Sequence, residues 1–408
     1  MHMPRALLAI AIVLSTMPSC TREVDGPPGY VTRDSAGITI VENDHTRPLW
    51  RMEEAWRIAP APLMQIGSVE DDSAYVLHRP WHARRLSHGP IAVVNNGTAQ
   101  IRLFDANGRH VRSLGRRGDG PGEFRDPWKV HELPGDSLLV IDLYGPISIF
   151  RPDGEFVRRF RLARPNEAFG HGPEPVDQFG DGTLLFRRQF GEEPNWRGVR
   201  RNRITMVRHG LDGEVRGSLG EFDDQTVLYN ANGFYRFGAW AKEASADSSM
   251  WYGPGDRFEL REIALDGRLK RLIRLDRPNR PVTERDRNLS RDSALARYRG
   301  TRQEAAYNQM LANTQYAAAF PAHFELMVDA LGNLWVQDYQ QFQLRIPRLW
   351  SVFDSAGRFL GDVEMPGGFR LYQIGADFVL GRWQDDLDVE YIRVHRIEKP
   401  APRAAARD

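Results

Sequence analysis

The segment Ile101–Arg109 (IRLFDANGR) places an apolar, alternating stretch directly before a short polar step and a glycine, and Trp350–Arg358 (WSVFDSAGR) repeats the arrangement. Two strands joined by a short turn of Asp or Asn with Gly form a β-hairpin. The turn glycine occurs six times, at Gly37, Gly108, Gly154, Gly213, Gly267 and Gly357. Six hairpins at long, uneven spacing predict a repeat fold, and this spacing favours the blades of a propeller.

The two ends of the chain indicate how such a ring closes. The turn Asp34–Gly37 leads into the apolar strand Ile38–Val41 but has no blade before it, whereas the last unit, Asp377–Ile397, lacks a glycine turn and a final strand. Joining the two removes open sheet edges. We therefore expect an all-β fold, a six-bladed β-propeller closed by the N-terminal strand, with Ile38–Val41 paired to Val389–Ile397.

One interval between turn glycines, from Gly267 to Gly357, is about twice as long as that from Gly108 to Gly154. The excess is rich in Ala, Arg, Gln and Glu and poor in β-branched residues, which favours helix. Pro281 and Pro321 flank it, as prolines flank helix boundaries. We predict one helical insertion over residues 283–320 within a propeller that spans residues 37–398. Its role as a lid, a partner surface or simple packing stays open.

Composition excludes some functions. The 408 residues carry 55 basic and 54 acidic side chains, a net charge of +1, so nucleic acid is not an expected partner. The single cysteine, Cys20, lies in the N-terminal region and leaves none for a disulfide or for thiol catalysis in the folded part.

The N-terminus has the pattern of an export signal. Arg5 precedes the apolar run Ala6–Leu14, which is too short to cross a bilayer because spanning takes about 20 residues. Cys20 follows the small Ser19, and this ending resembles the lipobox of bacterial lipoproteins, with Met17 and Pro18 as departures. The resemblance implies a signal peptide over residues 1–19 and a lipidated Cys20. An ordinary signal peptide with an accidental cysteine is the alternative.

The remaining boundaries follow from these. Residues 20–36 are expected to form a flexible, lipid-anchored tether, and residues 399–408 a disordered tail. The chain would then be exported to a bacterial cell envelope and face the periplasm or the exterior, with the lipid anchor as its contact with the membrane.

The Gly-rich stretch Gly115–Phe124, placed just after Phe104–Gly108, resembles the loop between blades of NHL-type six-bladed propellers. Gly217–Phe222 is a reduced copy, and Gly332–Val336 is similar to the same group. The resemblance implies a TolB-like six-bladed propeller. Some members of this group bind proteins, and other six-bladed propellers, such as gluconolactonase-like hydrolases, hold a divalent metal in the central channel.

Three polar residues end corresponding strands of different blades: Asn95, Asp142 and Asp338. Equivalent strand ends lie on one face of a propeller, where oxygen ligands could converge on a hard cation such as Ca²⁺. The alternative is that each side chain caps its own turn, as Asp and Asn commonly do. If these residues lie on the second strands of their blades, they would also be farther from the propeller axis than the innermost strands.

The sequence carries no other catalytic motif, neither His-Glu-x-x-His nor Gly-x-Ser-x-Gly. We therefore expect a binding or scaffold module for a protein or glycan partner, with no required cofactor, rather than an enzyme. A channel-metal-dependent hydrolase or lyase of the gluconolactonase-like type is the alternative.

Overall fold

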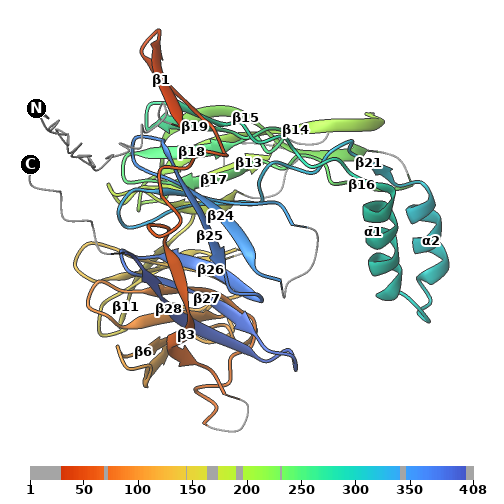
Figure 1. The fold of residues 1–408 in the computed structure, drawn as a ribbon. Coiled ribbons are helices and arrows are strands. Elements are labelled where there is room, and N and C mark those ends of the chain that lie inside the picture. The colour runs from red at the N-terminus through yellow and green to blue at the C-terminus, as the bar shows by residue number, and fades with distance from the viewer. Residues whose placement is uncertain are drawn as a thin grey trace, which may run out of the picture.

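The computed structural model describes residues 29–68, 72–143, 145–162, 173–189, 196–229, 232–340 and 346–400. Its strands form six sheets of four blade strands each, and a two-stranded sheet lies outside them. Figure 1 shows the blades gathered in one body, with two helices standing apart from it. The all-β, six-bladed propeller predicted from the turn repeat is confirmed.

Each blade is an antiparallel sheet that runs from the innermost strand outward. Blades one to three are β4 (Pro80–Arg85), β5 (Ile91–Asn95), β6 (Gln100–Phe104) and β7 (His110–Leu114); β8 (Pro127–Glu132), β9 (Leu138–Asp142), β10 (Ile147–Phe150) and β11 (Phe156–Phe160); and β12 (Glu174–Gln178), β13 (Leu184–Gln189), β14 (Gly198–His209) and β15 (Val215–Tyr229). Blades four to six are β17 (Lys242–Ser245), β18 (Ser249–Gly253), β19 (Glu259–Ala264) and β20 (Leu269–Leu275); β22 (Glu325–Val328), β23 (Leu334–Gln337), β24 (Arg348–Phe353) and β25 (Phe359–Met365); and β26 (Phe369–Ile374), β27 (Phe378–Gln384), β28 (Glu390–Glu398) and β3 (Arg57–Ile66).

The hydrophobic core is divided between neighbouring blades. A separate cluster of buried apolar side chains joins each adjacent pair, and the cluster between blades six and one completes the circle. The second strands supply much of this core because both of their faces are covered; all five residues of β5 and of β9 are buried. Burial on both faces explains why these strands are continuous apolar runs in the sequence.

The turn glycines have the conformation that the repeat predicted. Gly108 has φ of 79° and Gly357 has φ of 87°, a left-handed region that residues with a Cβ seldom occupy. Asp354 fixes the turn, since its Oδ1 accepts hydrogen bonds from the backbone N–H groups of Ala356 and Arg358 at 3.0 and 2.9 Å. Five of the six glycines join the third and fourth strands of blades one to five.

The sixth, Gly37, belongs to a different hairpin, so the predicted closing strand was wrong. Ile38–Val41 lies in β2 (Ile38–Asn43), which pairs in parallel with β20 on the outer edge of blade four. The strand that closes blade six is β3, antiparallel to β28. Pro60 and Pro62 make β3 unlike a strand in the sequence. An outermost strand tolerates proline because the edge that faces away from the sheet forms no hydrogen bonds to a neighbouring strand.

The N-terminal hairpin also corrects the predicted tether. Residues Tyr30–Ser35 form β1, which pairs with β2 over its whole length and extends blade four to six strands. The earlier part of the expected tether, the signal peptide and Cys20 lie outside the described residues, as do residues 401–408 of the expected tail.

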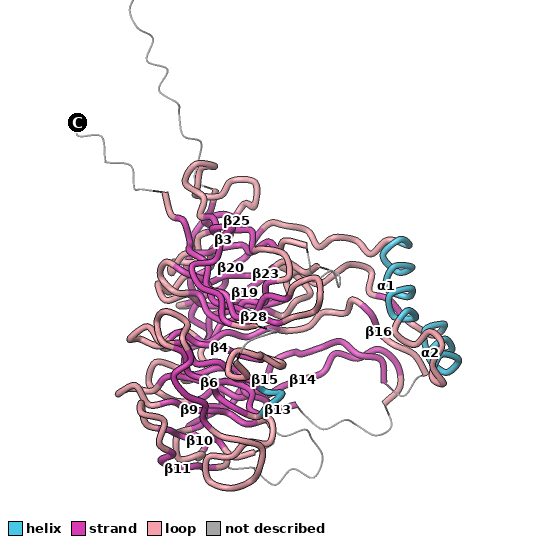
Figure 2. Tube along the Cα trace, turned by 90° about the horizontal axis from the view of Figure 1, so that it is seen from below, coloured by secondary structure: helices cyan, strands magenta, loops and turns pink. Residues whose placement is uncertain are grey.

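The helical insertion occurs where it was predicted, between β20 and β22. It comprises α1 (Glu284–Ala296), capped by Thr283 and Asp286 in a reciprocal capping box, and α2 (Glu304–Ala312). Two short parallel strands, β16 (Tyr235–Arg236) and β21 (Gln315–Tyr316), connect it to the chain that follows β15. Both views show the helices off the ring, on the side toward which β14 and β15 extend (Figures 1 and 2).

The two proposed loop motifs differ in the structure. In Gly115–Phe124, the chain turns back on itself, with a hydrogen bond of 2.9 Å from the Phe124 N–H to the Arg116 carbonyl, and the Phe124 ring is buried between blades one and two. This stretch is an inter-blade connection, as its resemblance implied. Gly217–Phe222 is not such a loop, because it lies inside β15.

Candidate functional site

The innermost strands of all six blades line one central cavity of about 770 Å³. Its wall consists of side chains from β4, β8, β12, β17, β22 and β26, and the turns that follow these strands form part of its rim. This volume is within the range of pockets that hold small molecules, about 300–1,000 Å³. We call this cavity the channel.

Blades one and two build their part of the wall from a repeated local sequence, Pro80-Trp81 in β4 and Pro127-Trp128 in β8. Each proline lies opposite the last residue of the second strand, and the register shifts immediately after it. Such a bulge bends a strand and redirects the side chain at the extra residue. The extra residue is the tryptophan in both blades, and the two rings contact each other edge to face with centroids 4.4 Å apart in the channel wall.

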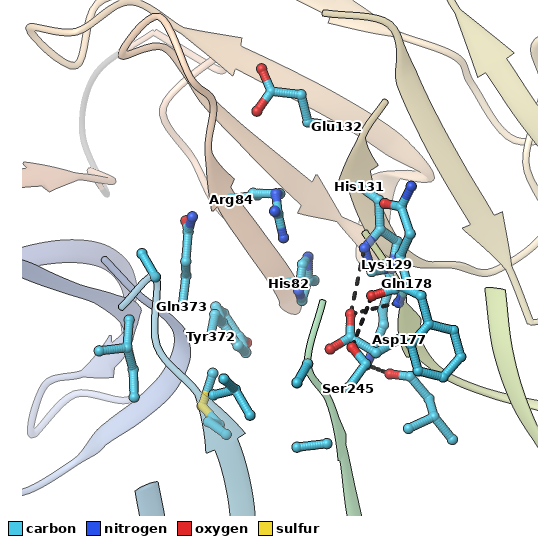
Figure 3. A pocket seen from close by; sticks show the side chains of 18 of the residues that line it. His82, Arg84, Lys129, His131, Glu132, Asp177, Gln178, Ser245, Tyr372 and Gln373 are labelled. Carbon is cyan, nitrogen blue, oxygen red and sulfur yellow. Dashed lines mark hydrogen bonds and ion pairs between the residues drawn. The ribbon is translucent and has the colours of Figure 1, made fainter. Parts of the chain in front are cut away.

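The same two strands carry a group of cationic and imidazole side chains: His82, Arg84, Lys129 and His131. Figure 3 shows Arg84 and His82 projecting from one strand, with His131 and Lys129 beside them. The Lys129 ammonium donates to the Val176 carbonyl. Among the described residues, neither ring nitrogen of His131 has a hydrogen-bond partner, although this side chain is only 2% exposed. We call these four residues the cationic wall.

Both histidines of the cationic wall are held in the neutral form. Burial lowers the pKa of His82 well below its ordinary value, and the charges of Lys129 and Arg84 lower it further. Burial also lowers the pKa of His131, with Arg84 and Lys129 again adding to the effect. The backbone N–H of Val130 donates to His82 Nδ1 at 3.4 Å, which leaves the proton of this neutral ring on Nε2.

Acidic residues line the opposite side. Glu243 of blade four and Glu325 of blade five line the channel, and in a ring of six blades these stand across the axis from blades one and two. The Glu243 side chain is 5% exposed, pairs with Arg187 at 3.6 Å, and leaves Oε1 without a hydrogen bond among the described residues. Burial raises the pKa of Glu243. The channel wall therefore carries Arg84 and Lys129 in blades one and two and the two glutamates in blades four and five.

Blade six adds a polar side that is fixed to blade one. The Tyr372 hydroxyl donates to the Pro80 carbonyl at 2.5 Å, and burial raises the pKa of Tyr372 to about 12. Gln373 accepts from the Arg85 N–H at 2.7 Å and donates to the Arg85 carbonyl at 3.3 Å. These bonds hold β26 against β4 and so fix the position of the cationic wall.

Two of the predicted metal ligands, Asn95 and Asp142, are the last residues of second strands, and their side chains form hydrogen bonds with backbone groups there. Asn95 accepts from the His78 N–H at 2.7 Å and donates to the Thr98 hydroxyl at 2.8 Å. Asp142 accepts from the backbone N–H of Arg125 at 2.6 Å and from that of Asp126 at 3.1 Å. Each side chain thus stabilises the connection at its own blade.

The third, Asp338, follows the second strand of blade five and forms an ion pair with Arg277 at 2.5 Å. Burial raises the pKa of Asp338 to about 6, although Arg277 opposes this shift. None of the three lines the channel, and each has different partners. Within the described ranges, no group of three His, Cys, Asp or Glu side chains is placed to hold a metal ion.

Sequence reasoning missed the cationic wall, since its four residues share no motif and their histidines are only two among eleven. The available signal was the repeated Pro-Trp pair, which marks the same position of two successive blades. Of the described helices, neither is long and apolar enough to span a membrane.

Comparison with known proteins gives the fold. No family model matches the chain, and no curated protein matches it. A member of the DUF4221 family from Bacteroides vulgatus ATCC 8482 matches with a TM-score of 0.52 and 11% identity, covering 85% of this chain and 100% of that one. An exported protein from Bacteroides fragilis NCTC 9343 matches with a TM-score of 0.46 and 11% identity, covering 88% and 100%.

A catalytically inactive virginiamycin B lyase from Staphylococcus aureus, solved with quinupristin, matches with a TM-score of 0.40 and 12% identity, covering 84% of this chain and 94% of the lyase. At these identities the likeness concerns the fold alone. The chain is a six-bladed β-propeller, similar in architecture to the DUF4221 family member.

Proposed function

We propose that this protein is an exported, lipid-anchored binding module that takes a glycan into the channel. The observation that carries the proposal is the wall of the cavity, where a tryptophan pair stands beside polar side chains that lack partners in the described chain. Buried polar groups in folded proteins are nearly always hydrogen-bonded, so unpaired ones facing a cavity indicate a ligand or ordered water.

The chemistry of the wall suits a sugar. Trp81 and Trp128 offer aromatic surface to the C–H groups of a sugar ring, while the imidazoles and the polar groups of blade six can bond its hydroxyls. Pockets for small molecules combine apolar surface with a few placed polar groups in this way. The closed ring keeps the site rigid, because each blade is packed on both neighbours.

The alternative is a metal-dependent hydrolase or lyase. Asn95, Asp142 and Asp338 are its candidate ligands, and each is already engaged by a backbone amide or by Arg277. A cation would have to displace these partners and draw together three side chains that contact different parts of the chain. The binding function requires no such rearrangement.

A glycan array tests the proposal, with the full chain carrying Cys20→Ser for solubility. The expected result is binding to a small set of glycans, weakened at least tenfold by Trp128→Ala and unchanged by Trp196→Ala, since Trp196 is 42% exposed and outside the channel. Glycans recovered intact after long incubation support binding, whereas cleaved glycans favour the enzyme. Absence of binding to any glycan contradicts the proposal.

The anchor is proposed from Cys20 and the apolar run before it. Several acyl chains on one cysteine bind a membrane stably, because each buried CH₂ adds about 0.8 kcal/mol. Membrane fractionation compares the parent with Cys20→Ser: the parent should sediment with membranes and the variant should be released. A variant that stays on the membrane contradicts lipid anchoring at Cys20.

A further inference from the structure

Arg84 has no counter-ion in the described chain. Its Nε is buried and has no hydrogen-bond partner, and no carboxylate of the described residues lies within ion-pair distance of its guanidinium. Arg187, by contrast, is paired with Glu174, Glu243 and Asp224. Arg84 is half-buried in the channel wall, and a partly desolvated guanidinium without a counter-ion is favourable to an anionic ligand.

The neighbours of Arg84 make the same region favourable for an anion. Lys129 adds a second positive charge in the next blade, and no ion pair joins it to a described residue. His131 is almost fully buried with both ring nitrogens unpaired in the described structure, so its neutral ring has an N–H to donate. His82 supplies another N–H donor from Nε2.

Of the described carboxylates near this group, Glu132 and Asp177 are paired with neither Arg84 nor Lys129. Glu132 accepts hydrogen bonds from the N–H and hydroxyl of Ser87, in the turn that follows β4. Asp177 accepts from the Gln178 N–H at 2.9 Å, and its other contact is His131 Nδ1 at 3.7 Å, beyond hydrogen-bond distance. Figure 3 shows Glu132 set apart from Arg84 and Asp177 on the far side of His82.

The acidic side of the channel limits the ligand to one anionic group. Glu325 faces the cationic wall from across the axis, so a second negative charge on the same ligand would lie on its side of the channel. Like charges at short range in a partly dry site repel strongly. The planar fork of Arg84 matches a carboxylate, which it can bond through two N–H groups at once.

We propose that the cationic wall is a carboxylate-binding subsite, with Arg84 as its principal ligand residue, and that the glycan carries a uronic acid or a similar singly charged sugar acid. This inference rests on the proposed glycan-binding function and names the class of sugar. Arg84 bonds the carboxylate, His82 and His131 donate to its oxygens, and Lys129 adds charge.

Titration calorimetry on the full Cys20→Ser chain tests the subsite with four probes: D-galacturonate, its neutral parent D-galactose, acetate and inorganic phosphate. D-galacturonate should bind at least tenfold more tightly than the others. Arg84→Gln should lower the affinity for D-galacturonate at least tenfold, and Arg84→Lys should bind it more tightly than Arg84→Gln but less tightly than the parent. Arg109→Gln, the same change at an exposed arginine of the same blade, should have no effect.

The outcomes separate the two proposals. Equal binding of D-galacturonate and D-galactose, unaffected by Arg84→Gln, overturns the carboxylate subsite and leaves glycan binding intact. Acetate bound as tightly as D-galacturonate, with the same dependence on Arg84, supports the subsite but contradicts the glycan. Phosphate bound more tightly than either carboxylate overturns the single-charge argument. No binding of D-galacturonate by a folded chain overturns the inference.

Arg84→Gln should fold normally because Arg84 has no partner to lose, and its melting temperature checks this.

Discussion

Replacing Asn43 should show how firmly the N-terminal hairpin is joined to the ring. Asn43 ends β2 and is 3% exposed. Its Nδ2 donates to the Arg274 carbonyl in blade four and to the Gly357 carbonyl in blade five, both at 3.1 Å, and its Oδ1 accepts from the Phe359 N–H at 2.8 Å. One side chain therefore bonds two blades.

The magnitude follows from these three bonds. Leaving one buried polar group unsatisfied costs about 1–3 kcal/mol. Asn43→Ala leaves three backbone groups without their partner, and water can reach some of them, so the expected loss is about 3–5 kcal/mol of unfolding free energy. Asn43→Asp should also destabilise, because a carboxylate accepts from Phe359 but cannot donate to the two carbonyls.

The assay is urea unfolding of the full chain at pH 7, followed by circular dichroism and tryptophan fluorescence. The matched control is Asn107→Ala, since Asn107 lies exposed in the turn between β6 and β7 and should change stability by less than about 0.5 kcal/mol. If Asn43→Ala unfolds at the same urea concentration as the control, the hairpin does not tie the two blades and the reasoning is refuted.

Three further predictions follow from the structure. Removal of residues 1–47 takes Asn43 with it and should leave a propeller that is folded but less stable, whereas removal of residues 1–67 also deletes β3 and should abolish cooperative thermal unfolding. Equal melting temperatures for the two would show that β3 does not close the ring. Burial lowers the pKa of His323 to about 3, so between about pH 6.5 and pH 3 the unfolded chain binds a proton that the folded chain does not, and the free energy of unfolding should fall as the pH falls. His323→Leu should reduce this pH dependence by about 1.4 kcal/mol per pH unit. An unchanged slope in urea unfolding at several pH values would contradict this. Burial raises the pKa of Asp338 to about 6, so the folded chain holds the proton more tightly than the unfolded chain, and the contribution of Asp338 to stability should fall as the pH rises from about 4 to 6. Asp338→Asn should abolish this part of the pH dependence. A variant whose unfolding free energy depends on pH as that of the parent does would count against it.

Much of the fold was predictable because it depends on local sequence. The turn around Gly357 requires a residue that accepts positive φ, and Asp354 adds the hydrogen bonds that close it, so the same short pattern marks blades one to five. The insertion was predictable from composition and from its flanking prolines. The closing strand was not predictable, because Pro60 and Pro62 make β3 unlike a strand in sequence. In addition, Asp34–Gly37 has the sequence of a turn between blade strands, but it connects β1 to β2, which are not among the four strands of a blade.

The candidate site was less accessible to sequence reasoning. Asn95 and Asp142 do lie at equivalent strand ends, as expected, but strand position does not reveal that their oxygens accept backbone N–H groups. The channel depends on which innermost-strand side chains point inward, and the bulges at Trp81 and Trp128 change that direction locally. Whether a charge such as Arg84 is compensated is decided by side chains from other blades, which a linear pattern does not place.

A crystal structure of the full Cys20→Ser chain with D-galacturonate tests the central claim most directly. The predicted result is a sugar in the channel, with its carboxylate about 2.7–3.0 Å from the guanidinium nitrogens of Arg84 and its ring against Trp81 or Trp128. A sugar bound on the helical insertion or on an outer blade surface, with the channel holding only water, would contradict it.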